Sequence, residues 1–381
     1  MKQSLKRTLP VCALILVLLG FTSNAATVPV HDPSIVIVYK DASGNSFPEN
    51  DAGGSRTKYY YVFGTMIGAA YSTDMINWTA FTPTFSVNGT VTTNYYQVFK
   101  AAADWSGHTT SDNVFGNLWA PDIIFNKVLN KWCLYFSVNG DNWMSSIVLL
   151  TSTKIEGPYQ MTGTVVFSGM DKHTSGAGNT EYTKVTGQST VANRYLDANG
   201  QWTGTYGSSC IDPTVLYDES GKLWMVYGSW SGGIFLIKLS EQNGLRDYSY
   251  NYGYTNFSAD GAVWSGTRLR YDPYMGIHLA GGYYVSGEGS YIEYIKDANG
   301  VGYYYLFVSM GFYSPEGGYT MRVFRSSTIN GIYTDITGDD AVFTKYIFNY
   351  GNNVQYGFPI MQNYKWSWVT AGNAQIAQGH N

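Results

Sequence analysis

Four stretches of the chain repeat one pattern, and this repeat constrains the fold more than any other feature. Each stretch opens on an acidic residue, enters a short apolar run, crosses a polar turn and continues in further runs rich in Val, Tyr and Trp. Short runs of this kind, separated by turns that contain Gly, are typical of antiparallel strands. The four opening acids are Asp32, Asp122, Asp212 and Glu288.

The spacing of the repeat predicts a β-propeller. Asp32, Asp122 and Asp212 are 90 residues apart, and Glu288 follows after 76. One small antiparallel sheet cannot bury both of its faces alone, and radial stacking of several such sheets solves this problem. A fifth opening, Gly379-His380-Asn381, ends the sequence. We therefore expect an all-β, five-bladed β-propeller whose fifth blade is truncated at the C-terminus.

The expected blades occupy residues 26–80, 118–164, 209–264 and 282–337, with long connections at 81–117 and 169–209. Loops of this length inside a compact domain are usually functional. The tail after residue 341 leads into the fifth blade. An open fifth sector would expose strand edges and apolar surface, so we expect the chain as written to be poorly soluble and weakly active.

Residues 1–25 have the pattern of a secretory signal peptide. Lys2, Lys6 and Arg7 precede an apolar stretch that ends at Phe21, and small residues follow. This stretch is too short to span a bilayer well, which argues against a membrane anchor. We expect residues 26–381 to form one secreted or periplasmic domain, acting as a monomer.

Composition excludes some classes of function. Charged residues make up only 13% of the chain, which has 34 Tyr and 43 Gly, as suits a turn-rich extracellular β protein. No basic run offers a nucleic-acid surface, and no zinc-type ligand spacing is present. Beyond the signal, Cys133 and Cys210 are the remaining cysteines. We expect Cys133 to be a buried free thiol, with a Cys133–Cys210 disulfide as the alternative.

The acids could form a catalytic set. In a propeller the first strand of each blade lines the axis, so residues at the start of these strands meet near one mouth of the channel. Carboxylates gathered in a partly desolvated pocket push their pKa values apart, so that one serves as an acid while another serves as a base. A single Asp-Pro is more often a turn at the start of a strand. Four acids in phase favour function.

Five motifs mark the blade openings: His31-Asp32-Pro33, Leu118-Trp119-Ala120-Pro121-Asp122, Ile211-Asp212-Pro213 with Tyr227-Gly228-Ser229-Trp230, Glu288-Gly289-Ser290-Tyr291-Ile292, and Gly379-His380-Asn381. As an ordered set they resemble the openings of glycoside hydrolase family 43, most of all its endo-α-1,5-L-arabinanases. The resemblance covers nearly all of residues 26–381. It departs at Ser290, where the family more often has proline.

The resemblance implies roles for individual residues. Asp32 matches the general base, Glu288 the general acid, and Asp212 the third carboxylate, which tunes and orients the acid. Asp122 lies outside this trio and is expected to be structural or substrate-binding. An inverting glycosidase of this kind holds its acid and base about 6.5–9.5 Å apart to admit a water. The resemblance also implies a calcium ion near the axis, with His380 in its shell.

Ser229 and three aromatic side chains are expected near the substrate. Trp119, Trp143 and Trp230 offer flat rings that suit the apolar face of a furanose, although packing between blades is the alternative for each. In the second blade many arabinanases have an aromatic side chain that stacks on sugar, and Trp143 is expected to take its place from a shifted position in the sequence. Trp132 and Trp224 fall in mid-strand and are expected in the core.

The sequence thus favours a secreted, inverting endo-arabinanase that acts on plant α-1,5-arabinan. Two alternatives stay open. One is an exo-acting α-L-arabinofuranosidase or β-xylosidase on the same scaffold, because the shape of the loops at 81–117 and 169–209 decides whether one end of the cleft is blocked. The other is a carbohydrate-binding propeller without catalysis, which would have no need of the trio Asp32, Asp212 and Glu288.

Overall fold

The structure is a computed structural model, and the part of the chain it describes is 28–172, 180–204, 207–230, 232–252, 271–282, 287–311, 319–342, 357–362, 364–365 and 375–376. The expected signal peptide, 1–25, and His380 lie outside these residues. Within them, no helix has both the length and the apolar character needed to cross a membrane.

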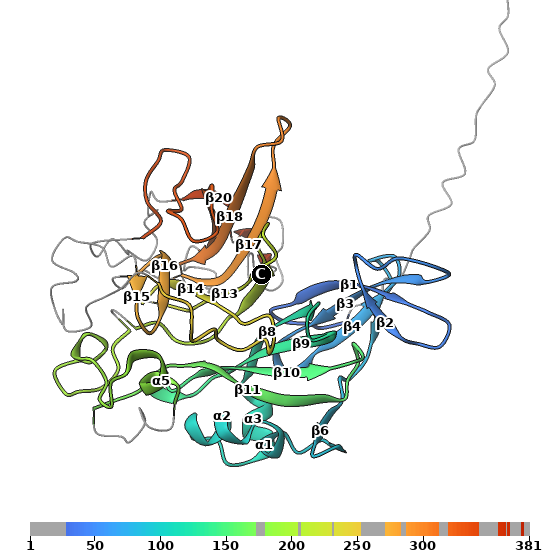
Figure 1. The fold of residues 1–381 in the computed structure, drawn as a ribbon, viewed down its shortest axis with the longest axis horizontal. Coiled ribbons are helices and arrows are strands. Elements are labelled where there is room, and N and C mark those ends of the chain that lie inside the picture. Colours follow the sequence, from blue (N-terminus) through green and yellow to red (C-terminus); the bar gives the residue numbers. More distant parts are fainter. Residues whose placement is uncertain are drawn as a thin grey trace, which may run out of the picture.

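Four sheets, antiparallel except for the β6–β11 pair, follow one another along the chain and are arranged around a common centre (Figure 1). The first sheet has the order β2-β1-β3-β4-β5, with β1 (Ser34–Lys40), β2 (Ser46–Pro48), β3 (Thr57–Phe63), β4 (Ala69–Ser72) and β5 (Thr79–Ala80). The second has the order β7-β6-β11-β10-β9-β8, with β6 (Phe85–Val87), β7 (Thr90–Thr92), β8 (Leu118–Asn126), β9 (Lys131–Val138), β10 (Ser146–Ser152) and β11 (Tyr159–Phe167).

The third sheet has the order β12-β13-β14-β16-β15, with β12 (Thr214–Tyr217), β13 (Leu223–Tyr227), β14 (Ile234–Lys238), β15 (Tyr271–Asp272) and β16 (Gly276–Ala280). The fourth has the order β17-β18-β19-β20, with β17 (Glu288–Lys296), β18 (Gly302–Met310), β19 (Thr320–Ser326) and β20 (Phe358–Gln362). A two-stranded pair follows, with β21 (Tyr364–Lys365) and β22 (Gln375–Ile376).

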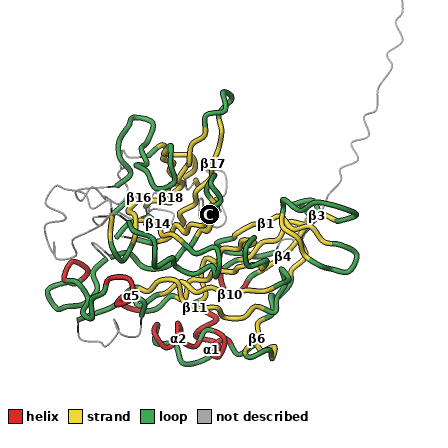
Figure 2. Tube along the Cα trace, viewed as in Figure 1, coloured by secondary structure: helices red, strands yellow, loops and turns green. Residues whose placement is uncertain are grey.

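Helices are few among the strands (Figure 2). Among the described residues, the α-helices are α1 (Tyr95–Val98), α2 (Lys100–Trp105), α3 (Ser111–Gly116) and α5 (Tyr182–Thr186), and the 3-10 helices are η1 (Thr65–Ile67), η2 (Asp141–Trp143) and η3 (Asn193–Tyr195). The four-bladed part of the predicted propeller is therefore confirmed. A complete fifth blade is not seen among the described residues, which contribute only β21 and β22 beyond the fourth sheet.

One kind of turn closes three of the hairpin-like connections after the first strands. In 41–45, 218–222 and 297–301 the leading Asp side chain accepts backbone amides two and four residues ahead. The Gly before the last residue has a positive φ of 77–81°. Asp favours such turns because its carboxylate bonds the following amides, and Gly takes the left-handed conformation without a steric cost.

Side-chain alternation along the central strands explains how the sheets stack. On β9, Trp132, Leu134 and Phe136 belong to the core shared with the first sheet, whereas Cys133 and Tyr135 belong to the core shared with the third. Strand β13 alternates in the same way between the second and fourth sheets. Because successive side chains of a strand point to opposite faces, a strand buried on both faces reads as one continuous apolar run.

Expectations about single core residues are confirmed. Trp132 and Trp224 are buried at 0% and 4% exposure. Cys133 and Cys210 are both buried and free, so they form no disulfide.

The expected blade boundaries were wrong in two places. The third blade does not end at 264, since β16 pairs with β14, and the fourth does not end at 337, since β20 pairs with β19. The third blade gains β16 and β15 and the fourth gains β20, outer strands that the sequence repeat did not reveal. The connection at 81–117 is also not a plain loop, because it contains α1 to α3 and β6, which pairs in parallel with β11.

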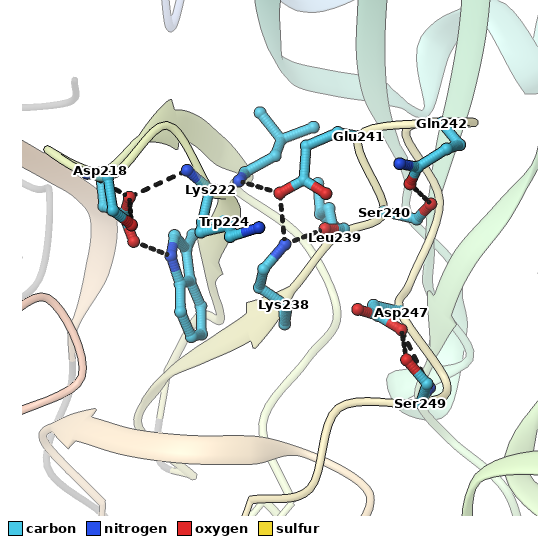
Figure 3. A network of polar contacts seen from close by, with 12 residues as sticks. Asp218, Lys222, Trp224, Lys238, Leu239, Ser240, Glu241, Gln242, Asp247 and Ser249 are labelled. Atoms are coloured by element: carbon cyan, nitrogen blue, oxygen red, sulfur yellow. Dashed lines mark hydrogen bonds and ion pairs between the residues drawn. The ribbon is translucent and has the colours of Figure 1, made fainter. Parts of the chain in front are cut away.

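A polar network fixes the outer part of the third sheet (Figure 3). The buried ammonium of Lys238 donates to the carbonyl of Leu239 and, at 2.8 Å, to Glu241 Oε1, which also accepts the amide of Leu223. Trp224 Nε1 donates to Asp218 Oδ2 at 2.9 Å. Each buried charge has a partner of opposite sign or a backbone group, which is the condition for tolerating it inside a protein.

Candidate active site

The four blade openings share one strained turn. The residue before Pro33, Pro121 and Pro213 has a positive φ, and so has the residue before Ser290: 49° at Asp32, 35° at Ala120, 56° at Asp212 and 54° at Gly289. Left-handed backbone is uncommon for residues other than Gly, Asn and Asp. These four residues therefore occupy the same position in the repeat, and the strain is concentrated where the first strands begin.

This register corrects the expectation that the four acids are in phase. Asp32 and Asp212 occupy the left-handed position, Glu288 lies one residue before it, and Asp122 lies two residues after it. The β8–β9 ladder shifts between Trp119 and Asp122, and the β17–β18 ladder shifts between Glu288 and Tyr291, so an irregularity in the pairing accompanies the left-handed residue in both blades. A bulge adds a residue to one strand and re-aims the neighbouring side chains.

Asp32 is held by two neighbours at the opening of the first blade. Its Oδ2 accepts the hydroxyl of Thr65 at 2.6 Å and lies 2.6 Å from His31 Nδ1. The Asp32 side chain is only 9% exposed. The same Thr65 oxygen accepts the amide of Ala120 at 2.9 Å, which links the base candidate to the second blade.

Asp212 and Glu288 meet at the junction of the third and fourth blades. The amide of Gly289, the residue after Glu288, donates to Asp212 Oδ2 at 3.2 Å. The Thr214 hydroxyl donates to the carbonyl of Ser290 at 2.8 Å. Asp212 is 3% exposed. The third carboxylate thus fixes the backbone that carries the acid candidate.

Two hydroxyls contact the carboxyl of Glu288. Tyr319 donates to Oε1 at 2.8 Å, and Ser229 donates to Oε2 at 3.3 Å. Burial, and then the negative charge of Glu288, raise the pKa of Tyr319 well above its ordinary value, with Asp212 adding to the effect. Tyr319 therefore stays protonated and acts as a donor. Ser229 is 2% exposed and contacts the acid candidate, and its expected contact with substrate stays a prediction.

In each of the first three units, a Thr or Ser lies at the end of the second strand or just after it. The role of these hydroxyls was not predicted from the sequence. Thr65 bonds the opening of the second blade through Ala120, Ser137 accepts the amide of Asp212 at 3.0 Å, and Ser229 bonds Glu288. Each hydroxyl thus contacts the opening of the next blade. The signal was available, because the second run of every unit is followed by or ends in Thr or Ser.

Asp122 joins three blades near the axis. Its Oδ1 accepts the hydroxyl of Ser34 at 2.5 Å from the first blade, and its Oδ2 accepts the amide of Val215 at 2.6 Å from the third. Burial raises the pKa of Asp122 to about 6. These contacts give it the structural role that was one of its two expected roles, and a role in substrate binding stays a prediction.

A cavity of about 470 Å³ lies on the axis below the openings. Residues that follow the openings on the first strands of all four blades line it, among them Ser34, Asp122, Thr214 and Tyr291. The lining confirms that β1, β8, β12 and β17 surround the axis. The opening turns with Asp32, Asp212 and Gly289 therefore stand together at one end of it.

The three aromatic candidates, Trp119, Trp143 and Trp230, are each partly buried. Trp119 Nε1 donates to the carbonyl of Gly116 at 2.9 Å. Trp143 packs against the core between the second and third sheets, and its ring lies so close to Gly204 that an added Cβ would be 2.7 Å away. Contact of the three rings with substrate stays a prediction.

The backbone of Trp230 ties the end of the third blade's second strand to the start of the fourth blade. Its amide donates to the carbonyl of Gly287, directly before Glu288, at 2.9 Å. The indole therefore projects from backbone that is fixed next to the acid candidate. A φ of 55° at Trp230 places this residue in left-handed backbone as well. Strained backbone at such a junction is typical of functional sites.

Among the residues that the structure describes, no group of three or more His, Cys, Asp or Glu side chains could hold a metal ion. His380, the residue expected in a calcium shell, lies outside them. Three acids near the blade openings, Asp32, Asp122 and Asp212, bond hydroxyls and backbone amides. Calcium thus enters no chemical step derived from these residues.

No family model matches the chain. Individual proteins do match it. An extracellular endo-α-(1→5)-L-arabinanase 2 of Bacillus subtilis is 27% identical over 390 residues, covering 98% of this chain and 67% of that protein. An extracellular endo-α-(1→5)-L-arabinanase of Thermotoga petrophila is 30% identical over 356 residues, covering 92% of this chain and 61% of that protein.

A solved structure supports the same relationship. A family 43 glycoside hydrolase from Bacillus licheniformis superposes with a TM-score of 0.59 at 29% identity, covering 88% of this chain and 60% of that one. The chain thus spans about three fifths to two thirds of the length of these proteins. In sequence and in fold, the chain is similar to a family 43 glycoside hydrolase, and its resemblance to the endo-arabinanases is confirmed.

Proposed function

We propose that this protein is an inverting endo-arabinanase that hydrolyses α-1,5-L-arabinofuranosidic bonds in plant arabinan. The observation that carries the proposal is the linked set of carboxylates at the blade openings. Asp212 holds the amide next to Glu288, and Asp32 begins the first blade at the same kind of turn. The similarity to endo-arabinanases over most of the chain supports the choice of substrate.

Each carboxylate has one part in the proposed reaction. Asp32 takes a proton from a water, whose oxygen forms a bond to the anomeric carbon. The bond from that carbon to the leaving O5 breaks, and Glu288 gives its proton to this oxygen. Asp212 keeps the acid oriented through the Gly289 amide. A single displacement of this kind inverts the anomeric centre.

Digestion of debranched arabinan tests the proposal. Wild-type protein should release reducing ends and yield oligosaccharides of several lengths early in the reaction, while Asp32→Asn and Glu288→Gln should lose nearly all of this activity. Arabinose as the sole early product would favour the exo-acting alternative. A wild-type protein that binds arabinan without releasing reducing ends would favour the carbohydrate-binding alternative and contradict the proposal.

Secretion and subunit state are part of the proposal. The two curated relatives are named extracellular, and residues 1–25 have the pattern of a signal peptide. We expect the protein in the culture medium of its host, with the periplasm as the alternative, and a monomer by light scattering. Cell-associated protein that keeps residues 1–25 would contradict secretion.

A calcium ion near His380 is likewise proposed, from the resemblance alone. Calorimetric titration with calcium after dialysis against EDTA should show binding, and His380→Ala should weaken it. Equal binding by wild type and variant would remove His380 from the site.

We propose a fifth sheet that begins with β21 and β22 and covers the outer faces of the first and fourth sheets. Exposed apolar side chains on β1 and β17 support it: Ile295 is 45% exposed, and Ile35 and Tyr291, which also line the axial cavity, are 52% and 41% exposed. Exposed apolar side chains that cluster on a sheet face usually have a partner. Hydrogen exchange tests the idea: slow exchange of the β21 and β22 amides supports it, and exchange at the rate of a free peptide contradicts it.

A further inference from the structure

We propose that Tyr319 is a positioning residue for proton donation, which keeps the carboxyl of Glu288 in the orientation that serves the leaving oxygen. The inference rests on the proposed function, because it assigns a role within the same reaction. It starts from the contact between the Tyr319 hydroxyl and Glu288 Oε1 at 2.8 Å.

The hydroxyl comes from a different part of the blade than the acid. Glu288 begins β17, whereas Tyr319 directly precedes β19, and β18 lies between these two strands in the sheet. The Tyr319 side chain is 3% exposed, so its ring is fixed by packing. A hydroxyl on a buried, rigid ring can hold a carboxyl in place at little further cost in conformational entropy.

The second carboxyl oxygen of Glu288, Oε2, accepts a longer hydrogen bond than Oε1 does. Ser229 reaches Oε2 at 3.3 Å, a longer contact than that of Tyr319 to Oε1. A phenol that donates to Oε1 favours a protonated carboxyl in which Oε1 is the carbonyl oxygen, because a proton on Oε1 would compete with that bond. The catalytic proton then resides on Oε2.

Charge keeps Tyr319 in the donating state. Burial and the neighbouring negative charges of Glu288 and Asp212 all disfavour a phenolate at this position. Tyr319 therefore donates whether Glu288 is ionised or protonated. In the proposed reaction it neither gives nor takes a proton, and it acts only through Glu288.

The test exploits the leaving group. Arabinan leaves as a poor alkoxide and needs the proton of Glu288, whereas a dinitrophenyl group leaves without one. Tyr319→Phe should lower kcat on arabinan by about 10- to 100-fold, a part of the roughly 10²- to 10⁴-fold that acid–base catalysis contributes. The loss in kcat on a dinitrophenyl α-L-arabinobioside should be at least tenfold smaller. Sodium azide, added as an external nucleophile, should not alter the difference between the two losses.

Tyr333→Phe is the matched control. Tyr333 belongs to the same blade, is 0% exposed and donates its hydroxyl to the carbonyl of Ile329 at 3.0 Å. It should change the two rates equally or not at all. Ser229→Ala should show the leaving-group dependence of Tyr319→Phe with a smaller loss, and it provides the test if Tyr319→Phe does not fold.

Equal losses on both substrates, for the variants that fold, would overturn the positioning role and leave the proposed function standing. A wild-type protein that cleaves the aryl arabinobioside and arabinan establishes the reaction on which the comparison depends. If wild type cleaves neither substrate, the proposed function fails and the role of Tyr319 fails with it.

Discussion

The Asp122 carboxyl makes the stability of the propeller depend on pH in a direction that the structure fixes. Asp122 connects the first and third blades through Ser34 and Val215. Burial raises its pKa from 3.8 to about 6. A folded-state pKa above the unfolded value means that the folded protein binds the proton more tightly. The stabilisation that protonated Asp122 contributes is then fully present below about pH 4 and is lost as the pH rises through 6.

The magnitude follows from the shift. About two pKa units, at about 1.4 kcal/mol each, correspond to at most about 3 kcal/mol between pH 4 and pH 7. Asp122→Asn removes the charge and keeps the shape. Its amide oxygen can accept from Val215 while its NH₂ donates to the Ser34 hydroxyl, so both links between blades survive.

Urea unfolding of wild type and Asp122→Asn from pH 4 to pH 7 measures the effect. The stability of the variant relative to wild type should rise by about 2–3 kcal/mol over this range. Asp112→Asn, at an exposed position in α3, is the control and should show no such trend. A constant difference between Asp122→Asn and wild type across these pH values would refute the reasoning.

Three further variants test other contacts. Asp32→Ala should abolish release of reducing ends from arabinan while the circular dichroism spectrum stays native; near-normal activity would place the base elsewhere. Thr65→Val removes the hydroxyl shared by Asp32 and Ala120, and should cost about 1–3 kcal/mol in urea unfolding and lower kcat; an unchanged kcat would deny Thr65 a part in orienting Asp32. Gly204→Ala places a Cβ 2.7 Å from the Trp143 ring and should cost about 1–3 kcal/mol. Gly116→Ala, with open space around it, is its control, and equal stability of the two variants would show that the Trp143 ring is not fixed.

Much of the fold could be predicted because its signals are local. Apolar runs that alternate between two cores, and turns in which an Asp side chain bonds the amides ahead of it, both appear directly in the sequence. The outer strands were missed for the same reason. Strand β20 pairs with β19 across a long intervening segment, and nothing near Phe358 indicates that distant partner.

The sequence predicted which acids lie at the blade openings, but not the position of each acid relative to the left-handed residue of its blade. Spacing alone placed four acids in phase, but Ala120 and Gly289 hold the left-handed position that Asp32 and Asp212 hold in their blades, and the pairing is irregular at both. A bulge changes pairing by one residue, which a repeat of about 90 residues does not reveal. Tyr319 was missed because it reaches Glu288 across the sheet, whereas Thr65 and Ser137 belong to a recurring pattern that was present in the sequence.

The anomeric configuration of the first product tests the central claim most directly. Proton NMR of wild-type protein with an α-1,5-arabino-oligosaccharide reports hydrolysis and stereochemistry in one experiment. With Asp32 as base and Glu288 as acid, the reducing end released first should be the β-anomer, which then equilibrates to the α-anomer. The α-anomer as first product, or no hydrolysis at all, would contradict the account.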